Sequence, residues 1–478
     1  MRPQGWTGTR GWTPGRLLVV GLVVFLIVVA ARGLYVFPRL VGPTEDIRHG
    51  ARSVTAPVAN RSTFPDYRDT VWLPVRDLVS GGNPYDAVAY LDRHPYAFEF
   101  SYSPAQLTIF LPLGLLPWTV SASVWFVALV VASLALVGCA LALARLPRRV
   151  DLLLALTAAV LLLRPMALML TLGQTSILPL IATAVALGRP RNDWVTTVCV
   201  AITWLKPQFG IPVSALLLTA GLWRPVLKGV ALSLLVALPT LAWAVVNAGG
   251  VRAFVSSVLS APGAALGERV GNYMTPDLAS LVGRVTGTQT SAAVVGVCFL
   301  VVTGVGALAV GRYTGRGATE RAGVYVCAVT TVLLALPHGE YDLALLVPAS
   351  ALALIVVLGE DLVRRRFALA TVLLIGLALV PRGEQGYSLR EIEITVLVLV
   401  ATALVVRSSS GGRLGLAPLA VGVGAFLVLR YAVDATLGWD ATGLGLLPTV
   451  CVLACWLVSL GWLTIGSLRA GARTAVEV

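Results

Sequence analysis

Apolar runs of about 20 residues recur along this 478-residue chain, and they constrain its fold more than any other feature. A helix needs about 20 apolar residues to cross a hydrocarbon layer about 30 Å thick. Hydrophobic residues make up 57% of the sequence and charged residues only 12%, too few to cover the surface of a water-soluble chain. The runs also lack the two-residue alternation of a membrane barrel strand. The sequence therefore predicts an all-α, polytopic integral membrane protein.

The apolar runs predict about 11 to 14 transmembrane helices. The first, 17–37, follows three arginines and has no small-residue cleavage site, so we interpret it as an uncleaved signal anchor. Prolines interrupt the run 104–117, which we expect to be re-entrant or half-length. The remaining candidate spans are 119–144, 150–169, 175–187, 194–206, 207–222, 228–246, 291–311, 321–336, 341–358, 366–381, 389–406, 414–433 and 442–467.

The net charge of +13 follows from arginines and lysines in short loops. With the amino terminus inside, these basic loops all fall on the cytoplasmic side, as the positive-inside rule requires. They contain Arg145, Arg148 and Arg149; Arg189 and Arg191; Arg224 and Lys228; Arg312, Arg316 and Arg321; Arg364, Arg365 and Arg366; Arg407 and Arg413; and Arg469 and Arg473. No basic patch is interleaved with aromatic residues, so nucleic-acid binding is not predicted.

The threading divides the chain into three parts. Residues 1–16 are a cytoplasmic amino terminus, and 17–406 form a transmembrane domain. Residues 407–478 are further transmembrane helices with a short cytoplasmic tail. Two long outer loops, 38–103 and 247–290, interrupt the central part. The six cysteines lie inside apolar runs without histidine or acidic neighbours, which predicts neither disulfides nor a metal site.

The first outer loop carries an acidic segment with an apolar set at helical spacing behind it. This pattern predicts an amphipathic helix at the membrane surface, with Asp66 near its start. Asp66 has two interpretations there, a helix N-cap or a general base facing a lipid-linked substrate. Asp69 and Asp77 compete for the role of base. The following Gly-Gly-Asn-Pro-Tyr, 81–85, predicts a structural turn.

Two later segments place polar side chains against apolar runs. Gln174 lies in Gly-Gln-Thr-Ser at the end of a span, where it either satisfies freed backbone groups or faces a cavity. Lys206 interrupts a long apolar stretch, which costs roughly 2.5–3.5 kcal/mol in lipid. Its ammonium either snorkels to the interface or is aimed at a phosphate. Pro207 ends a half-helix beside it, and Gln208 adds a hydrogen-bond donor.

The remaining outer polar residues lie in the carboxyl-terminal half. His338 is in Pro-His-Gly-Glu-Tyr-Asp between two spans, and Arg382 is in a charged loop with Glu384 and Arg390. A metal site needs three or four donors, and no cluster such as His-Glu-x-x-His is present. The sequence therefore predicts no metal ligands.

In this order, the motifs resemble glycosyltransferase family 87, the actinobacterial polyprenol-phosphate-mannose-dependent α-mannosyltransferases. The resemblance covers roughly residues 17–400. The motifs are Asp-Tyr-Arg with Gly-Gly-Asn-Pro-Tyr-Asp, then Tyr-Ser-Pro, Gly-Gln-Thr-Ser, Lys-Pro-Gln and Pro-His with Tyr-Asp. The resemblance implies a GT-C-like fold in the plasma (inner) membrane, without metal or other cofactor. It also implies an extracytoplasmic site that uses a polyprenyl-phosphate-sugar donor and a glycolipid or glycan acceptor.

Residue by residue, the resemblance makes Asp66 the general base and places His338 near the donor phosphate or acceptor. It places Lys206 at the family's Lys-Pro position. We also expect substrate contacts from a further polar set, of which Arg382 matches no motif. This set is Gln174, Tyr67, Arg68, Gln208 and Arg382.

The expected reaction is an inverting transfer, which needs one base for the incoming hydroxyl and cations for the leaving phosphate. Unlike a glycosidase, it needs no second carboxylate. The sugar, mannose or arabinose, and the acceptor stay open. A transporter or flippase is the competing class, because buried charge and broken helices fit it as well. A non-catalytic scaffold is the third, and the gathering of polar motifs on one face argues against it.

Overall fold

The computed structural model describes residues 14–40, 64–94, 97, 100, 102–147, 149–191, 193–258, 276–286, 291–313, 318–359, 362–379 and 446–476. The regular structure of these residues is helical throughout. The predicted all-α class is therefore confirmed. The two candidate spans 389–406 and 414–433 and the loop that contains Arg382 lie outside the described residues.

The amino-terminal helices are α1 (Pro14–Leu40), α2 (Pro65–Tyr67), the π-helical turn η3 (Arg68–Trp72), α3 (Leu73–Val79), α4 (Ala87–Arg93), α5 (Pro104–Gly114), α6 (Trp118–Leu143), α7 (Val150–Leu162), α8 (Arg164–Leu172), α9 (Ile177–Gly188), α10 (Trp194–Thr203) and α11 (Pro207–Thr219). They are followed by α12 (Trp223–Asn247), α14 (Leu278–Thr286), α15 (Ala292–Tyr313), α16 (Ala318–Ala335), the 3₁₀ turn η4 (Glu340–Leu345), α17 (Leu346–Gly359), α18 (Leu362–Leu379) and α21 (Leu446–Val476).

Four helical segments are each long and apolar enough to cross a membrane alone: Trp118–Leu143, Trp223–Asn247, Ala292–Tyr313 and Glu340–Val357. The pair α7 and α8 adds a fifth if it counts as one span, bent by 79° at its break. Their outward side chains include many exposed leucines and valines, as lipid-facing helices require. The chain is therefore a multi-pass membrane protein.

Several predicted spans are half-length helices in the structure. α9, α10 and α11 have 12, 10 and 13 residues, or roughly 15–20 Å at 1.5 Å per residue. The sequence explains the break between α10 and α11, because Pro207 lacks the N–H that would continue a helix. α5, with 11 residues, is half-length as the prolines of 104–117 predicted.

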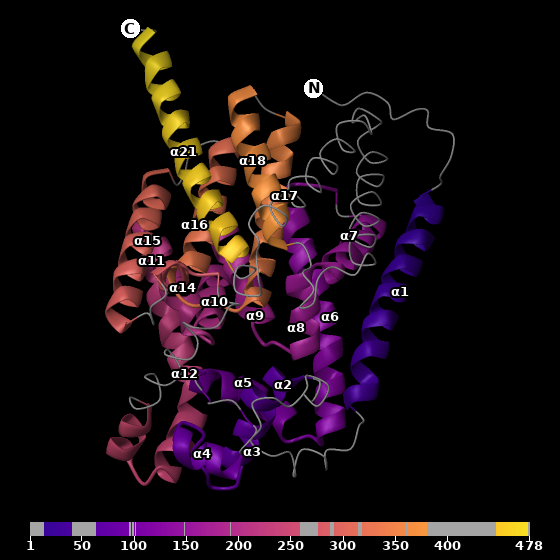
Figure 1. The fold of residues 1–478 in the computed structure, drawn as a ribbon, viewed down its shortest axis with the longest axis vertical. Helices are drawn as coiled ribbons and strands as arrows, with labels where there is room; N and C mark the ends of the chain where they lie inside the picture. Colours follow the sequence, from indigo (N-terminus) through magenta and orange to yellow (C-terminus); the bar gives the residue numbers. More distant parts are fainter. Residues whose placement is uncertain are drawn as a thin grey trace.

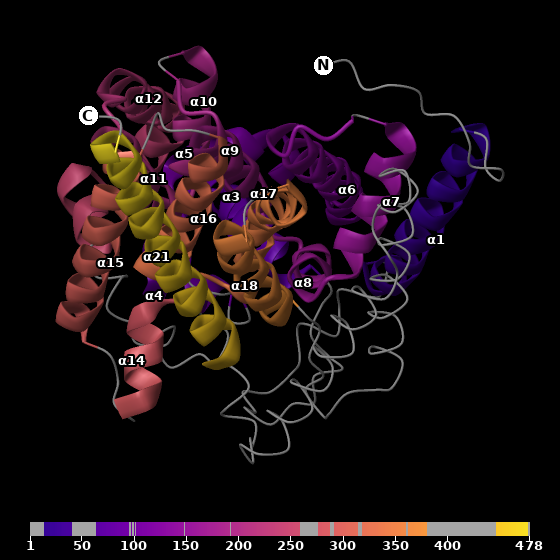
Figure 2. The same cartoon turned by 90° about the horizontal axis from the view of Figure 1, so that it is seen from above.

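The membrane helices pack around α6, α9, α16 and α17. Seen from above in Figure 2, α17 lies among α6, α16 and α18, and it contacts each of these three helices. One large core cluster joins buried side chains from α6, α9, α11 and α16. The site described below lies against this core.

The short helices α2 to α5 lie at one end of the bundle, at the bottom of Figure 1, whereas the amino-terminal end of α1 lies at the top. This end holds the part of the first outer loop that the structure describes. Two of the basic loops meet at one point, where Arg189 after α9 donates to the carbonyl of Ala142 near the end of α6, 3.4 Å away. The sidedness of these segments in the membrane stays a prediction.

Candidate active site

Three side chains from distant parts of the chain meet in one chain of polar contacts. Gln174 donates through Nε2 to Asp66 Oδ2, although 108 residues separate the two. The Lys206 ammonium donates to Gln174 Oε1 at 3.2 Å. The two ends of the Gln174 amide therefore face charges of the sign that each end prefers. We call Asp66, Gln174 and Lys206 the polar relay.

Lys206 is only 1% exposed, and the groups in direct contact with its ammonium are neutral. Its ammonium also donates to Ser176 Oγ. It lies 4.9 Å from the ring centre of Tyr102 and 5.3 Å from that of Tyr341, within the range of cation–π attraction. In the part of the chain that the structure describes, no carboxylate lies within 4.0 Å of it. A buried cation held only by hydroxyl, amide and ring faces favours an anionic ligand.

Two helices of more than ten residues begin at Lys206 and its hydroxyl partner. Lys206 is the N-cap of α11, and Ser176 is the N-cap of α9. Helix N-termini carry partial positive charge and unsatisfied N–H groups. The breaks between α8 and α9 and between α10 and α11 therefore add positive potential beside Lys206.

Gly173 explains why Asp66 reaches Gln174. It ends α8 with φ +72°, a left-handed conformation that glycine adopts without strain. A Cβ there would lie 2.6 Å from Phe64 Cδ1 and 2.7 Å from Tyr67 Cβ. Because glycine has no side chain, α2 packs directly on this turn, and Phe64 N donates to the carbonyl of Thr171 at 3.1 Å.

Gln106 on α5 forms hydrogen bonds to both segments that meet near Gln174. Its Nε2 donates to the carbonyl of Thr70 at 3.2 Å, and its Oε1 accepts from Thr175 Oγ1 at 3.4 Å. Gln106 is buried. It therefore ties η3 to the turn that carries Gln174.

The segment that carries His338 is pinned at two points. Arg164 pairs with Glu340 at 2.7 Å, and His338 Nδ1 lies 3.1 Å from Asp342 Oδ2. The Tyr341 ring, between these two pairs, faces Lys206. These two contacts therefore fix the position of the Tyr341 ring beside Lys206.

His338 itself is buried behind the polar relay. Its Nε2 lies 3.1 Å from the carbonyl of Val332, so both ring nitrogens have partners. Its ring meets that of Phe209 edge to face, with the centres 4.5 Å apart. In this arrangement His338 orients its own segment, and its catalytic role stays a prediction.

The structure shows the surroundings of three other expected substrate contacts, Tyr67, Arg68 and Gln208, whose contact with substrate stays a prediction. Tyr67 is fully buried, with its hydroxyl 2.8 Å from Ser121 Oγ and its ring stacked on Trp125. Burial raises the pKa of Tyr67 to about 12, although the hydrogen bond to Ser121 lowers the pKa by a smaller amount. We therefore assign Tyr67 to the core. Arg68 pairs with Asp69, and Gln208 is half-buried with no hydrogen bond to the described residues.

The rival carboxylates are each paired with an arginine. Asp69 Oδ1 lies 2.6 Å from Arg68 Nε, and Asp77 Oδ1 lies 2.7 Å from Arg93 Nε. Both are buried, whereas Asp66 is half-buried. An adjacent guanidinium makes a carboxylate a weaker base, which argues against Asp69 and Asp77 as the general base.

Ser176, Tyr102 and Tyr341 were not among the expected contacts. Each is a member of a motif that the sequence showed: Ser176 of Gly-Gln-Thr-Ser, Tyr102 of Tyr-Ser-Pro and Tyr341 of Glu-Tyr-Asp. The available signal was therefore the motif itself, without an indication of which member faces the site. No group of three or more potential metal ligands occurs among the described residues.

The comparisons with known proteins assign a family. Residues 100–337, about half of the chain, match Glycosyltransferase family 87. This stretch contains Gln174 and Lys206 of the polar relay. No curated protein and no solved structure matches the chain. On the family match, the protein belongs to glycosyltransferase family 87 and is a membrane glycosyltransferase.

Proposed function

We propose that the protein transfers a sugar, mannose in the first instance, from a polyprenyl-phosphate donor to a lipid-linked or cell-envelope glycan acceptor. The transfer takes place on the extracytoplasmic side of the plasma membrane. The family match supports glycosyl transfer. The donor class is supported by one observation above all, the buried Lys206 ammonium without a carboxylate partner among the described residues.

The donor phosphate fits beside Lys206. A phosphate there would receive charge-assisted hydrogen bonds from the ammonium, with the Ser176 hydroxyl and the N-termini of α9 and α11 close by. These groups stabilise negative charge that grows on the phosphate as the sugar leaves. The rings of Tyr102 and Tyr341 fix the ammonium at the same place.

Asp66 fits the role of general base. It removes the proton from the acceptor hydroxyl while that oxygen attacks C1 of the sugar. The bond between C1 and the phosphate oxygen breaks on the opposite face, so a β-linked donor gives an α-linked product. Gln174 separates the carboxylate from the ammonium. The base and the cation therefore do not neutralise each other through a direct ion pair.

The buried pair His338 and Asp342 acts in this proposal through Tyr341. The pair holds the segment that presents the Tyr341 ring to Lys206. The donor is already activated by its phosphate ester, so the reaction as proposed uses no cofactor.

The test is a transfer assay with the purified full-length protein in lipid nanodiscs. The probe is synthetic polyprenyl-phosphate mannose with a mannosyl glycolipid acceptor, and the readout is released polyprenyl phosphate together with the linkage of the new bond. We expect an α-linked product, and we expect the transfer activity to persist in the presence of EDTA. A product with retained β configuration, or a strict need for a divalent metal, would contradict the proposal.

The transporter alternative predicts a different result. Broken helices around a buried charge also occur in transporters. Movement of the lipid-linked sugar across proteoliposomes, without a new glycosidic bond and driven by an ion gradient, would replace the transferase proposal.

A further inference from the structure

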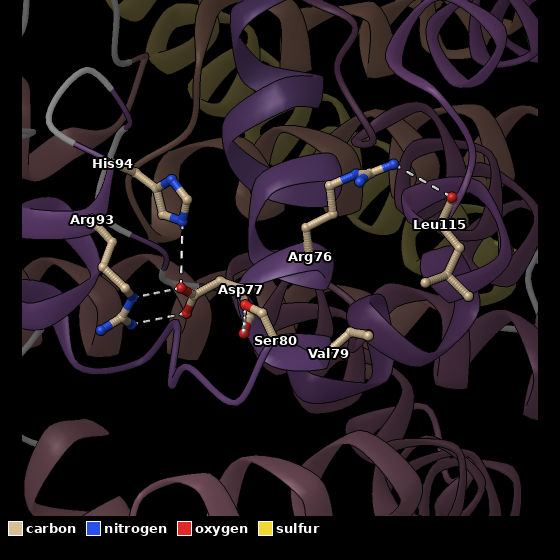
Figure 3. A pocket seen from close by; sticks show the side chains of 7 residues that line it. All are labelled: Arg76, Asp77, Val79, Ser80, Arg93, His94 and Leu115. Carbon is tan, nitrogen blue, oxygen red and sulfur yellow. Dashed lines mark hydrogen bonds and ion pairs between the residues drawn. The ribbon is translucent and has the colours of Figure 1, made fainter. Parts of the chain in front are cut away.

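A hollow of about 400 Å³, lined by charged and apolar side chains, opens between the end of α3, the end of α4 and the loop after α5. Figure 3 shows Arg93, His94 and Asp77 on one side of it and Arg76 with Leu115 on the other. Val79 and Ser80 complete the lining. The transfer mechanism uses none of these residues.

Arg76 supplies a positive charge to this hollow. Its Nη2 donates to the main-chain carbonyls of Leu115 and Leu116 at 3.5 and 3.0 Å. Its guanidinium lies 4.5 Å from the ring centre of Trp72. No carboxylate of the described residues lies within 4.0 Å of it. The planar group is thus held in place while its charge is not neutralised.

The acidic residue that lines the hollow, Asp77, is already paired with an arginine. Both carboxylate oxygens of Asp77 accept from Arg93, at 2.7 and 3.0 Å. Nε2 of His94 lies 3.4 Å from Asp77 Oδ1. With Arg76, Arg93 and Asp77 counted, the hollow carries an excess positive charge. It therefore suits an anion and not a cation.

The hollow lies where a membrane span begins. α6, one of the helices long enough to cross alone, starts at Trp118, three residues after Leu115. The Trp72 and Trp118 rings are 5.4 Å apart, and Trp72 Nε1 donates to the carbonyl of Leu116 at 3.0 Å. Tryptophan pairs of this kind mark the level of lipid headgroups.

The rim of the hollow combines this charge with apolar surface. Leu115 and Val79 are 52% and 40% exposed. A headgroup phosphate beside Arg76 would place its glycerol and the first acyl carbons against such side chains. A free phosphate ion would make no use of this apolar rim.

The hollow is separate from the polar relay. Asp66 and Arg76 lie ten residues apart on one helical stretch, roughly 15 Å at 1.5 Å per residue. α5 connects the two places: Tyr102, whose ring faces Lys206, lies just before its start, and Leu115 lies just after its end. One phosphate group cannot contact Lys206 and Arg76 together.

We propose that this hollow binds the phosphate of an anionic membrane lipid headgroup, with Arg76 as its main contact. In this proposal the lipid lies at the outer membrane surface beside the amino-terminal end of α6. It would anchor the short helices α3 and α5 to the bilayer. This site does not depend on the transfer reaction, because it requires neither a sugar donor nor an acceptor.

The test measures lipid binding to the purified full-length protein by native mass spectrometry, in a neutral detergent and without any sugar donor. The probes are phosphatidylglycerol and phosphatidylcholine with the same acyl chains. For the wild type we expect the first phosphatidylglycerol to bind about fivefold more tightly than phosphatidylcholine. We expect Arg76→Gln to remove that preference, a loss of about fivefold for a partly exposed charge pair.

Two further variants keep the test decisive if Arg76→Gln folds poorly. Leu115→Asp places a carboxylate beside the intact Arg76, at an exposed position, and should also abolish the preference. Arg252→Gln removes an exposed arginine on the neighbouring helical turn 251–258 that does not line the hollow, and should leave it unchanged.

Equal binding of the two lipids by the wild type, or an unchanged preference in Arg76→Gln and Leu115→Asp, would overturn the proposal. Competition by millimolar glycerol phosphate would overturn its lipid part, since it would identify the ligand as a soluble phosphate.

Discussion

The Lys206 ammonium and the Gln174 side-chain carbonyl are 3.2 Å apart, although the residues lie at two different helix breaks, between α10 and α11 and between α8 and α9. The contact makes Gln174 a spacer between a cation and the Asp66 carboxylate. A direct ion pair would weaken both the base and the anion site. With the amide between them, Lys206 and Asp66 do not form such a pair.

Asp66→Asn tests the general base. The change keeps the shape of the side chain and removes the proton acceptor, so we expect transfer to fall about 10²–10⁴-fold. The measurement is turnover with saturating donor and acceptor, normalised to protein in the membrane. Asp69→Asn is the matched control and should be milder, because Asp69 is paired with Arg68. Loss of activity in Asp69→Asn with more than half retained in Asp66→Asn would reverse the assignment.

Lys206→Met separates function from stability. A buried ammonium without a carboxylate beside it costs folding free energy, so we expect the melting temperature to stay the same or rise. Use of the polyprenyl-phosphate donor should fall about 10–100-fold, from the loss of a charge-assisted contact of about 1.5–3 kcal/mol.

The control for Lys206→Met is Lys228→Met, which removes a lysine on α12 that stacks on Trp194. Its donor kinetics should match the wild type. A lower melting temperature in Lys206→Met together with an unchanged KM for the donor would make Lys206 a structural residue.

His338→Ala tests whether the histidine acts on substrate or on its own segment. The change leaves the buried Asp342 without its ring partner, which we expect to cost about 3–5 kcal/mol of stability and to reduce turnover. The double variant His338→Leu/Asp342→Leu removes both buried polar side chains and should restore the melting temperature. If turnover returns with stability, His338 is a positioning residue. If turnover stays low, the histidine acts in the reaction itself.

The sequence predicted the membrane class and drew attention to Lys206 for physical reasons. Lys206 was recognisable because a cation next to an apolar run is costly, and Pro207 marked the break beside it. The half-length of α10 and α11 follows from the same break. These features are local, so a single sequence contains them.

The contacts between segments were not predictable in the same way. Asp66 and Gln174 meet because Gly173 admits α2 against the turn, a packing detail that neither motif contains. Tyr67 stands beside Asp66 in the same motif, yet its side chain points into the aromatic core. One step along a helix turns a side chain by about 100°, so neighbours in a motif face different surroundings.

Asp77 predicts an acid limit for the first outer region. Burial alone would raise the pKa of Asp77, but hydrogen bonds from His94 and Arg93 and the charge of Arg93 hold it below its ordinary value of 3.8. A depressed pKa stabilises the fold above the unfolded value, and this stability is lost as pH falls through the folded value. Wild-type stability should therefore decline below about pH 4.

The comparison for Asp77 is Asp77→Asn, measured by thermal unfolding between pH 3 and pH 7. At pH 7 the variant should be less stable by about 1–3 kcal/mol, and the gap should narrow toward pH 3. A constant gap over the whole range would show that the Arg93 pair does not carry this dependence.

Cysteine labelling tests the sidedness of the site. Val88→Cys changes a side chain that is 75% exposed on α4, in the first outer loop. Arg191→Cys changes an exposed residue in the basic loop between α9 and α10. The six native cysteines are buried or half-buried, which keeps the background low. In intact cells an impermeant maleimide should label Val88→Cys and not Arg191→Cys, and both should react after lysis. Labelling of Arg191→Cys alone would place the polar relay on the cytoplasmic side, where nucleotide sugars would become the expected donors.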